Sequence, residues 1–223
     1  MIPGLALLAV DMGKAMLVWT GAAFAVAGVA YATSAPGLLG KRADGRIGAV
    51  RLILLLPYFL FTWSRWLLER LVVREDPWDE VAPGLFVGRW PAGMSLPPGI
   101  ALVVDMTAEL PAAASTRACD YLCLPCLDAA VPPRRPFAAL ARRIAAFRGR
   151  VYVHCALGHG RSATMATAVL LCRGVAPTVG EGIRMLRRAR PRVRLGARQV
   201  AFLETLESEL KDSPRAAEAL GRA

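Results

Sequence analysis

The residues best suited to chemistry lie between a predicted strand and a predicted helix. Residues 151–172 read VYVHCALGHGRSATMATAVLLC, in which Cys155 is followed by five residues and then by Arg161. A glycine-containing loop at such a junction can turn successive backbone N–H groups into one anion-binding hollow, and the following helix adds its positive N-terminal end. The guanidinium of Arg161 can bind two phosphate oxygens at once. Because the same field stabilises a thiolate, the spacing predicts a cysteine nucleophile that attacks a phosphate ester.

This stretch resembles the signature of the cysteine-dependent protein-tyrosine and dual-specificity phosphatases, which is His-Cys-five residues-Arg-Ser/Thr. The four fixed positions are filled here by His154, Cys155, Arg161 and Ser162. The resemblance covers roughly residues 80–210 and includes the segments VAPGLFVGRWP, VVDMTAEL and RRARPRVRLGARQVAFLETL. This chain has Gly160 where many dual-specificity members have Ser, and Gly196 where many have Asn. Neither departure touches the nucleophile or the arginine.

Phosphate ester cleavage also needs a general acid that protonates the leaving oxygen. In the family this acid is an aspartate on a loop upstream of the cysteine, and Asp105, Asp120 and Asp128 are the candidates here. Asp128 lies in LPCLDAAVPP, which resembles the dual-specificity pattern of a strand end, an aspartate and a proline-rich loop. Asp105 ends one predicted strand and Asp120 begins another, so we expect structural roles for both. The resemblance therefore implies Asp128 as the acid.

The same resemblance implies a role for each residue of the motif. Cys155 attacks phosphorus and forms a cysteinyl-phosphate intermediate, Asp128 protonates the leaving group and then activates water, and Ser162 helps the sulfur to leave. His154 orients the loop and is not a base, whereas His159 either faces substrate or is solvated. The expected substrate-binding residues are Ala156, Leu157, Gly158, His159, Gly160 and Arg161. No metal and no other cofactor is implied.

The elements that must position these residues follow from apolar patterning. Short apolar runs predict strands over residues 85–88, 101–105, 121–124 and 150–154. Helical patterns cover residues 135–147, 162–172, 178–189 and 197–210, and Thr178 with Glu181 predicts a capping box. Strands that alternate with helices indicate an α/β fold. With the resemblance, this predicts a cysteine-phosphatase fold with a central, mostly parallel sheet flanked by helices.

Composition separates a second region from this one. The 223 residues carry a net charge of +11 and only 20% charged residues, with a mean hydropathy of +0.41. These values exclude an intrinsically disordered chain and argue against a wholly soluble one. The long uncharged runs all lie before residue 77, whereas most of the positive charge follows it.

Two hydrophobic segments in the first region are long enough to interact with a bilayer. Residues 15–33 carry no charge, with Trp19 and Tyr31 toward their ends, which is typical of a membrane-spanning helix. A cleaved signal peptide fits less well, because no basic stretch precedes the run. Residues 47–64 form the second segment, followed by an amphipathic extension. It is either a second span or a helix that lies on the membrane surface.

We therefore expect a membrane-anchoring region over residues 1–76, a catalytic domain over 77–210 and a tail over 211–223. Basic residues flank both sides of the second segment, which a two-span hairpin cannot reconcile with the positive-inside rule. One span and an in-plane helix satisfy that rule, with the N-terminus outside and the catalytic domain in the cytoplasm. Five cysteines and a required thiolate also favour a reducing compartment.

Several alternatives stay open at this stage. The substrate is either a phosphoprotein or a lipid phosphate, and membrane lipids are expected partners. A catalytically silent scaffold that only binds phosphate is the alternative function. Cys126 could trap oxidised Cys155 as a protective disulfide, although burial is the simpler interpretation of Cys123 and Cys126. The arginine run over residues 184–194 suggests a solvated face near anionic lipid or substrate, with no nucleic acid as a partner.

Overall fold

A computed structural model describes residues 3–212, with side chains from residue 11 onward. At its centre is a five-stranded sheet in the order β1-β2-β5-β3-β4. The strands are β1 (Trp78–Ala82), β2 (Leu85–Gly88), β3 (Ile100–Asp105), β4 (Asp120–Cys123) and β5 (Arg150–His154). Only β1 pairs antiparallel, with β2, and the other three pairings are parallel. The mostly parallel sheet brings the carboxyl ends of β3, β4 and β5 to one edge.

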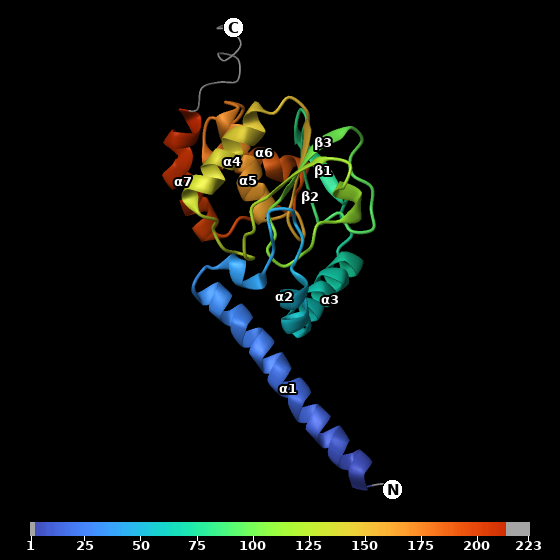
Figure 1. The fold of residues 1–223 in the computed structure, drawn as a ribbon. Helices are drawn as coiled ribbons and strands as arrows, with labels where there is room; N and C mark the ends of the chain where they lie inside the picture. The colour runs from blue at the N-terminus through green and yellow to red at the C-terminus, as the bar shows by residue number, and fades with distance from the viewer. Residues whose placement is uncertain (1–2, 213–223) are drawn as a thin grey trace.

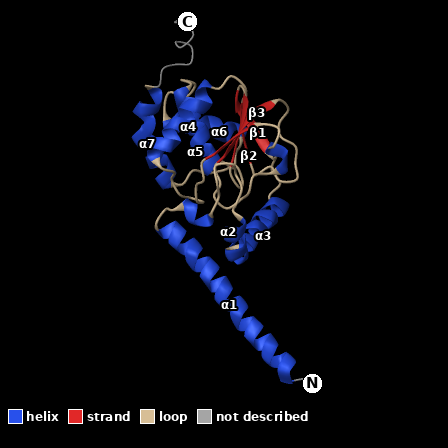
Figure 2. Ribbon diagram, in the orientation of Figure 1, coloured by secondary structure: helices blue, strands red, loops and turns tan. Residues whose placement is uncertain are grey.

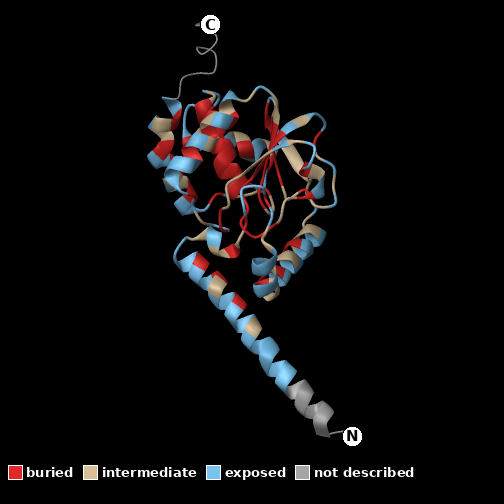
Figure 3. Ribbon diagram, in the orientation of Figure 1, coloured by how far each residue is buried: buried red, intermediate tan, exposed pale blue. Residues whose placement is uncertain are grey.

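Four helices form a layer beside this sheet (Figures 1 and 2). They are α4 (Arg134–Ala146), α5 (Arg161–Cys172), α6 (Val179–Ala189) and α7 (Ala197–Lys211). Every residue of α5 is buried, and α4, α6 and α7 all pack against it. The main core fills the space between these helices and the sheet (Figure 3). A smaller cluster of Phe86, Val103 and Tyr152 covers the other face.

The predicted α/β architecture is confirmed, and the elements after residue 84 lie within one or two residues of their predicted bounds. Strand β1 was missed, because WDEVA mixes charged and apolar residues and shows no continuous apolar run. Thr178 caps α6 by accepting a hydrogen bond from the Glu181 N–H, at 3.1 Å. The Glu181 carboxylate pairs with Arg184 instead of returning to the cap, so the predicted box is only half formed. Most of the predicted tail lies outside the described residues.

The N-terminal region begins with a long helix, α1 (Pro3–Ala32), that projects away from the sheet (Figure 1). Within the described residues it contains the one stretch long and apolar enough to cross a membrane, Asp11–Ala32. Small residues let a second helix approach it closely, since Ala23, Ala27 and Ala30 are all buried. The rest of α1 is largely exposed (Figure 3).

The second hydrophobic segment is broken into two helices, α2 (Ala49–Leu54) and α3 (Leu56–Val72). Pro57 lies in the first turn of α3, and its missing N–H and its ring prevent α2 from continuing. Phe24 of α1 packs edge-on against Tyr58 and Phe61 of α3, with ring centroids 5.9 and 5.6 Å apart. The segment therefore does not form one continuous helix over residues 47–64.

The loop between α1 and α2 is fixed to the sheet. Lys41 donates a hydrogen bond to the Asp105 carboxylate at 2.6 Å, and both side chains are fully buried. The Ala112 N–H also donates to the Gly45 carbonyl at 2.9 Å. Because this loop contacts the sheet, both lie on the same side of any membrane that α1 crosses. A second span over residues 47–64 is incompatible with these contacts.

Candidate active site

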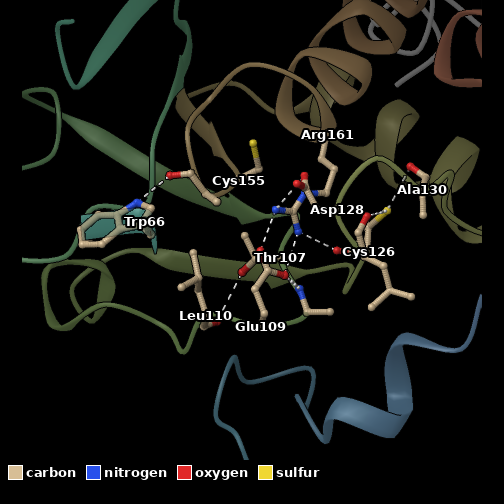
Figure 4. Close-up of polar contacts among 12 residues, drawn as sticks. Trp66, Thr107, Glu109, Leu110, Cys126, Asp128, Ala130, Cys155 and Arg161 are labelled. Carbon is tan, nitrogen blue, oxygen red and sulfur yellow. Dashed lines mark hydrogen bonds and ion pairs between the residues drawn. The ribbon is translucent and has the colours of Figure 1, made fainter. Parts of the chain in front are cut away.

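Cys155 lies directly after β5, and the loop that follows it ends where α5 begins at Arg161 (Figure 4). Its sulfur is 3.3 Å from the Ser162 hydroxyl, and it accepts a hydrogen bond from the Gly158 N–H at 3.3 Å. The loop bends sharply at Gly158, whose φ is +82°. A Cβ at this position would lie 2.6 Å from the carbonyl carbon of Gly88, so only glycine fits there.

The carbonyls of this loop show which way its N–H groups point. Each of the five carbonyls from Ala156 to Gly160 accepts a hydrogen bond from outside the loop. The donors are Trp66 and Trp90 to Ala156, Arg190 to Leu157 and Gly158, Arg194 to His159, and Thr164 to Gly160. In a trans peptide the N–H of the next residue points opposite to the carbonyl. The N–H groups of residues 157–161 are therefore directed away from these bonded carbonyls, and that of Gly158 donates to the Cys155 sulfur, so the loop has free N–H groups that can bind an anion.

Arg161 is held beneath this hollow by Glu109. Its two terminal nitrogens donate to the two Glu109 oxygens at 2.9 and 2.7 Å, and one of them also donates to the Cys126 carbonyl at 2.7 Å. Burial works to lower the pKa of Arg161, but the Glu109 carboxylate raises it well above its usual value. The Nε atom of Arg161 is buried and has no partner among the described residues. The guanidinium is thus charged, oriented, and left with a free donor.

The three aspartates considered for the general acid occupy different places. Asp128 lies at the cavity rim, 68% exposed, with one oxygen 3.4 Å from Arg161. Asp105 is buried, and Asp120 is exposed at the start of β4, away from the cavity lining. Burial works to raise the pKa of Asp105, but the charge of Lys41 holds it below its usual value. Of the three, the structure brings only Asp128 to the nucleophile.

His154 is fully buried between the sheet and the loop. Its Nε2 lies 3.7 Å from Asp105 and its Nδ1 lies 3.4 Å from the Cys155 carbonyl. Burial is the main cause that lowers its pKa, against the opposing effect of Asp105. A neutral imidazole packed in this position can hold the start of the loop in place.

The hollow opens into a cavity of about 910 Å³ with two walls. One wall is the Cys155 loop together with Asp128, the segment after α6 and Gln199. Gln199 accepts from the Gly196 N–H at 3.0 Å and donates to the Ala130 carbonyl at 3.4 Å. The other wall belongs to the N-terminal region and consists of Tyr31, Tyr58, Phe61, Thr62, Arg65, Trp66 and Glu69. The two predicted regions of the chain therefore share one cavity.

The N-terminal region also supports the loop directly. The Trp66 indole of α3 donates to the Ala156 carbonyl at 3.0 Å, and His159 lies 2.6 Å from the Glu75 carboxylate. Arg190, which is 1% exposed, donates to two loop carbonyls and pairs with Glu75 and Asp79 at 3.0 and 2.6 Å. The prediction of a solvated arginine face is therefore wrong at Arg190. Its partners lie too far away in sequence for a local pattern to reveal them.

Cys126 lies near the site but is poorly suited to trap an oxidised partner. Its thiol donates to the Leu127 and Ala130 carbonyls at 3.5 and 3.6 Å. Burial raises the pKa of this thiol to about 12, so it stays protonated at neutral pH and is a weak nucleophile. The structure argues against the protective disulfide and favours a packing role.

Sequence reasoning missed four residues that hold this site together: Trp66, Glu75, Glu109 and Arg190. Glu109 lies in the VVDMTAEL segment, in the loop that follows β3. A single acidic residue in a loop does not indicate which arginine it pairs with. Trp66 and Glu75 both fall in the segment that sequence reasoning assigned to the amphipathic extension of the anchoring region. Each of the four acts on a residue distant in sequence.

The comparisons with known proteins agree with this geometry. A family model described as Swiss Army Knife protein, DSP-PTPase phosphatase domain, matches residues 95–211, which is more than half of the chain. The human DUSP28 structure is 25% identical and covers 61% of this chain and 97% of its own, with a TM-score of 0.53. Tk-PTP in its active form is 24% identical, covers 59% and 97%, and has a TM-score of 0.51. PTPMT1 in complex with PI(5)P is 20% identical, covers 65% and 99%, and has a TM-score of 0.53. No curated protein matched the chain.

Proposed function

The chain belongs to the DSP-PTPase phosphatase family, whose members are phosphoric monoester hydrolases, and from this premise we propose that it is a membrane-tethered phosphatase that works through a cysteinyl-phosphate intermediate. The observation that carries the proposal is the Cys155 loop, in which the Gly158 N–H donates to the Cys155 sulfur and five loop carbonyls are bonded to groups outside the loop, which leaves the N–H groups of residues 157–161 available for an anion. Both a phosphoprotein and a lipid phosphate fit this chemistry.

The reaction proceeds in two displacements. The Cys155 thiolate attacks phosphorus, a sulfur–phosphorus bond forms, and the ester oxygen leaves with a proton from Asp128. Asp128 then takes a proton from water, whose oxygen attacks phosphorus and breaks the sulfur–phosphorus bond. Ser162 donates a hydrogen bond to the departing sulfur, and the loop N–H groups with Arg161 stabilise the phosphoryl oxygens in both steps. His154 holds the loop and takes no proton.

The membrane tether is α1, with the catalytic side in the cytoplasm. The described residues that contact α1 support a retained helix, because cleavage would expose the buried faces of Ala23, Ala27 and Ala30. Lys41 is neutralised by Asp105, but Arg42, Arg46 and Arg65 remain exposed on the side of the catalytic residues. This excess of exposed arginines is typical of the cytoplasmic side. All five cysteines are free thiols, which suits a reducing compartment.

The test is turnover of p-nitrophenyl phosphate by the full chain in detergent, with EDTA present. The whole chain is needed because Trp66 and Glu75 support the catalytic loop. We expect activity that vanadate blocks and that Cys155→Ser abolishes, while Cys119→Ser, at a half-buried thiol far from the cavity lining, retains it. Asp128→Asn should lower kcat by about 10²–10⁴-fold, the range for loss of a positioned acid. A folded wild-type protein without turnover would instead support the phosphate-binding scaffold.

A further inference from the structure

We propose that the substrate is a phospholipid with a terminal phosphomonoester, which reaches Cys155 from the bilayer along α3 while its acyl chains stay in the membrane. The inference rests on the proposed phosphatase function and names the substrate class of that site. Its basis is that α3, which packs against the candidate membrane span, forms one wall of the catalytic cavity together with Tyr31 of that span.

The contact between α1 and the start of α3 shows how deep α3 reaches along the candidate membrane span. The Trp19 indole donates a hydrogen bond to the Leu54 carbonyl at 2.9 Å, at the break between α2 and α3. Trp19 precedes the end of α1 at Ala32 by thirteen residues, which is about 20 Å along a helix axis. The start of α3 therefore lies beside the middle of the candidate span, below the level at which α1 ends.

The hydrogen bond from Trp19 to Leu54 also makes the break between α2 and α3 compatible with a lipid environment. A helix break leaves a backbone carbonyl without its helical donor, and in a bilayer no water can replace that donor. Here the Trp19 indole of the neighbouring helix α1 donates to the Leu54 carbonyl at the break. A broken helix at membrane depth needs such a donor from a neighbouring helix.

The outer surface of α2 and α3 is apolar in a way that the described chain beyond residue 72 is not. Nine large apolar side chains of these helices are exposed: Val50, Ile53, Leu54, Leu60, Phe61, Leu67, Leu68, Leu71 and Val72. Beyond residue 72, the described residues expose only two others, Val131 and Val175. Acyl chains match this surface, whereas a phosphopeptide arriving from water would leave it uncovered.

Phe61 connects this surface to the reaction centre. It is 56% exposed, and it also lines the cavity that contains Cys155. Arg65, Arg192 and Arg194 line the same cavity, and each is exposed. Apolar contact on the membrane side, with guanidinium groups near the nucleophile, matches a molecule that has a hydrocarbon end and a phosphate end.

The test uses the full chain in phosphatidylcholine nanodiscs with three phosphate esters of equal concentration. They are dioleoyl phosphatidic acid in the disc, water-soluble dihexanoyl phosphatidic acid, and a phosphotyrosine peptide. Because the disc holds substrate and enzyme together, we expect the dioleoyl lipid to be hydrolysed at least about tenfold faster than the other two. Preference for the peptide, or equal rates on the two lipids, would overturn the inference.

A variant pair tests the path itself. In Phe61→Asn, the ratio of the dioleoyl lipid rate to the p-nitrophenyl phosphate rate should fall about tenfold, the loss expected from an apolar contact to substrate. Val175→Asn, at an exposed valine far from the cavity, should leave the ratio unchanged. An unchanged ratio in Phe61→Asn contradicts the path. If the wild-type protein does not hydrolyse p-nitrophenyl phosphate, the proposed phosphatase function is contradicted. That result differs from an unchanged ratio in Phe61→Asn, which contradicts only the lipid path.

Discussion

The two walls of the catalytic cavity are stabilised in opposite ways. On the wall of the Cys155 loop, polar groups are buried and paired, as Arg161 is with Glu109 at 2.7 and 2.9 Å. On the α3 wall, apolar groups such as Phe61 are exposed. A buried, paired wall resists any change of geometry, whereas an exposed apolar wall needs a partner surface. This difference separates the residues that should affect every substrate from those that should affect only membrane substrates.

The largest effect is expected where the paired wall is broken. Glu109→Gln keeps the side-chain volume but replaces one carboxylate oxygen with a donor that faces the Arg161 guanidinium. Arg161 then loses its orientation, and kcat/KM should fall about a hundredfold on lipid and p-nitrophenyl phosphate alike.

Glu69→Gln is the matched control. Glu69 lines the same cavity, but its partner Arg65 is 65% exposed in its side chain, so activity should stay within about twofold. An equal loss in both variants would mean that pairing at Glu109 is not what the reaction requires.

The next largest effect is expected at the buried ion pair that attaches the N-terminal region to the sheet. Lys41→Met leaves the buried Asp105 carboxylate without its partner, which should lower the free energy of unfolding by about 3–5 kcal/mol at pH 7. The pKa of Asp105 is lowered in the native protein, so its stabilising contribution is full above the unfolded pKa of about 3.9 and is lost as the pH falls below it. In the variant Asp105 accepts a proton more readily, and the difference from wild type should shrink toward pH 4.

Urea unfolding in detergent at several pH values measures this difference. Lys211→Met, which removes a partly exposed pair with Glu207, serves as the control and should change stability little at either pH. A difference that grows on acidification would contradict the assignment of the effect to Asp105.

The smallest effect is expected at the contact between α3 and the loop. Trp66→Phe keeps the edge-on packing against Trp90, with centroids 4.9 Å apart, but removes the hydrogen bond to the Ala156 carbonyl. One such bond contributes about 0.5–1.5 kcal/mol, so kcat/KM should fall about three- to tenfold on soluble and membrane substrates alike. Trp78→Phe, which alters packing on Phe86, should have no effect. A loss confined to lipid would place Trp66 with the substrate path instead of the loop support.

Local patterns predicted the parts of this molecule that are local in space. The strand, loop and helix around Cys155 are contiguous in sequence, so glycine, arginine and apolar spacing define them together. Glu109 and Arg161 are separated by 52 residues, and Trp66 and Ala156 by 90. Such contacts depend on the strand order, which short motifs do not contain.

The second hydrophobic segment shows another limit of sequence reasoning. An apolar run over residues 47–64 has the same pattern whether it faces lipid, another helix or both, and α2 and α3 do contact α1. In the structure Pro57 lies at the break between α2 and α3. The contacts of Lys41 with Asp105 of β3 and of Gly45 with Ala112 exclude a second crossing.

The buried Lys41–Asp105 clamp and the Trp66 contact attach the sheet to α1 through two separate points, one before α2 and one near the end of α3. A catalytic unit on a flexible linker would sweep a large volume of solution. In a bilayer crossed by α1, this doubly anchored unit instead keeps its sulfur at a nearly constant height above the leaflet. Its search for substrate is then two-dimensional, and its rate should follow the mole fraction of substrate in the leaflet instead of the concentration in bulk water.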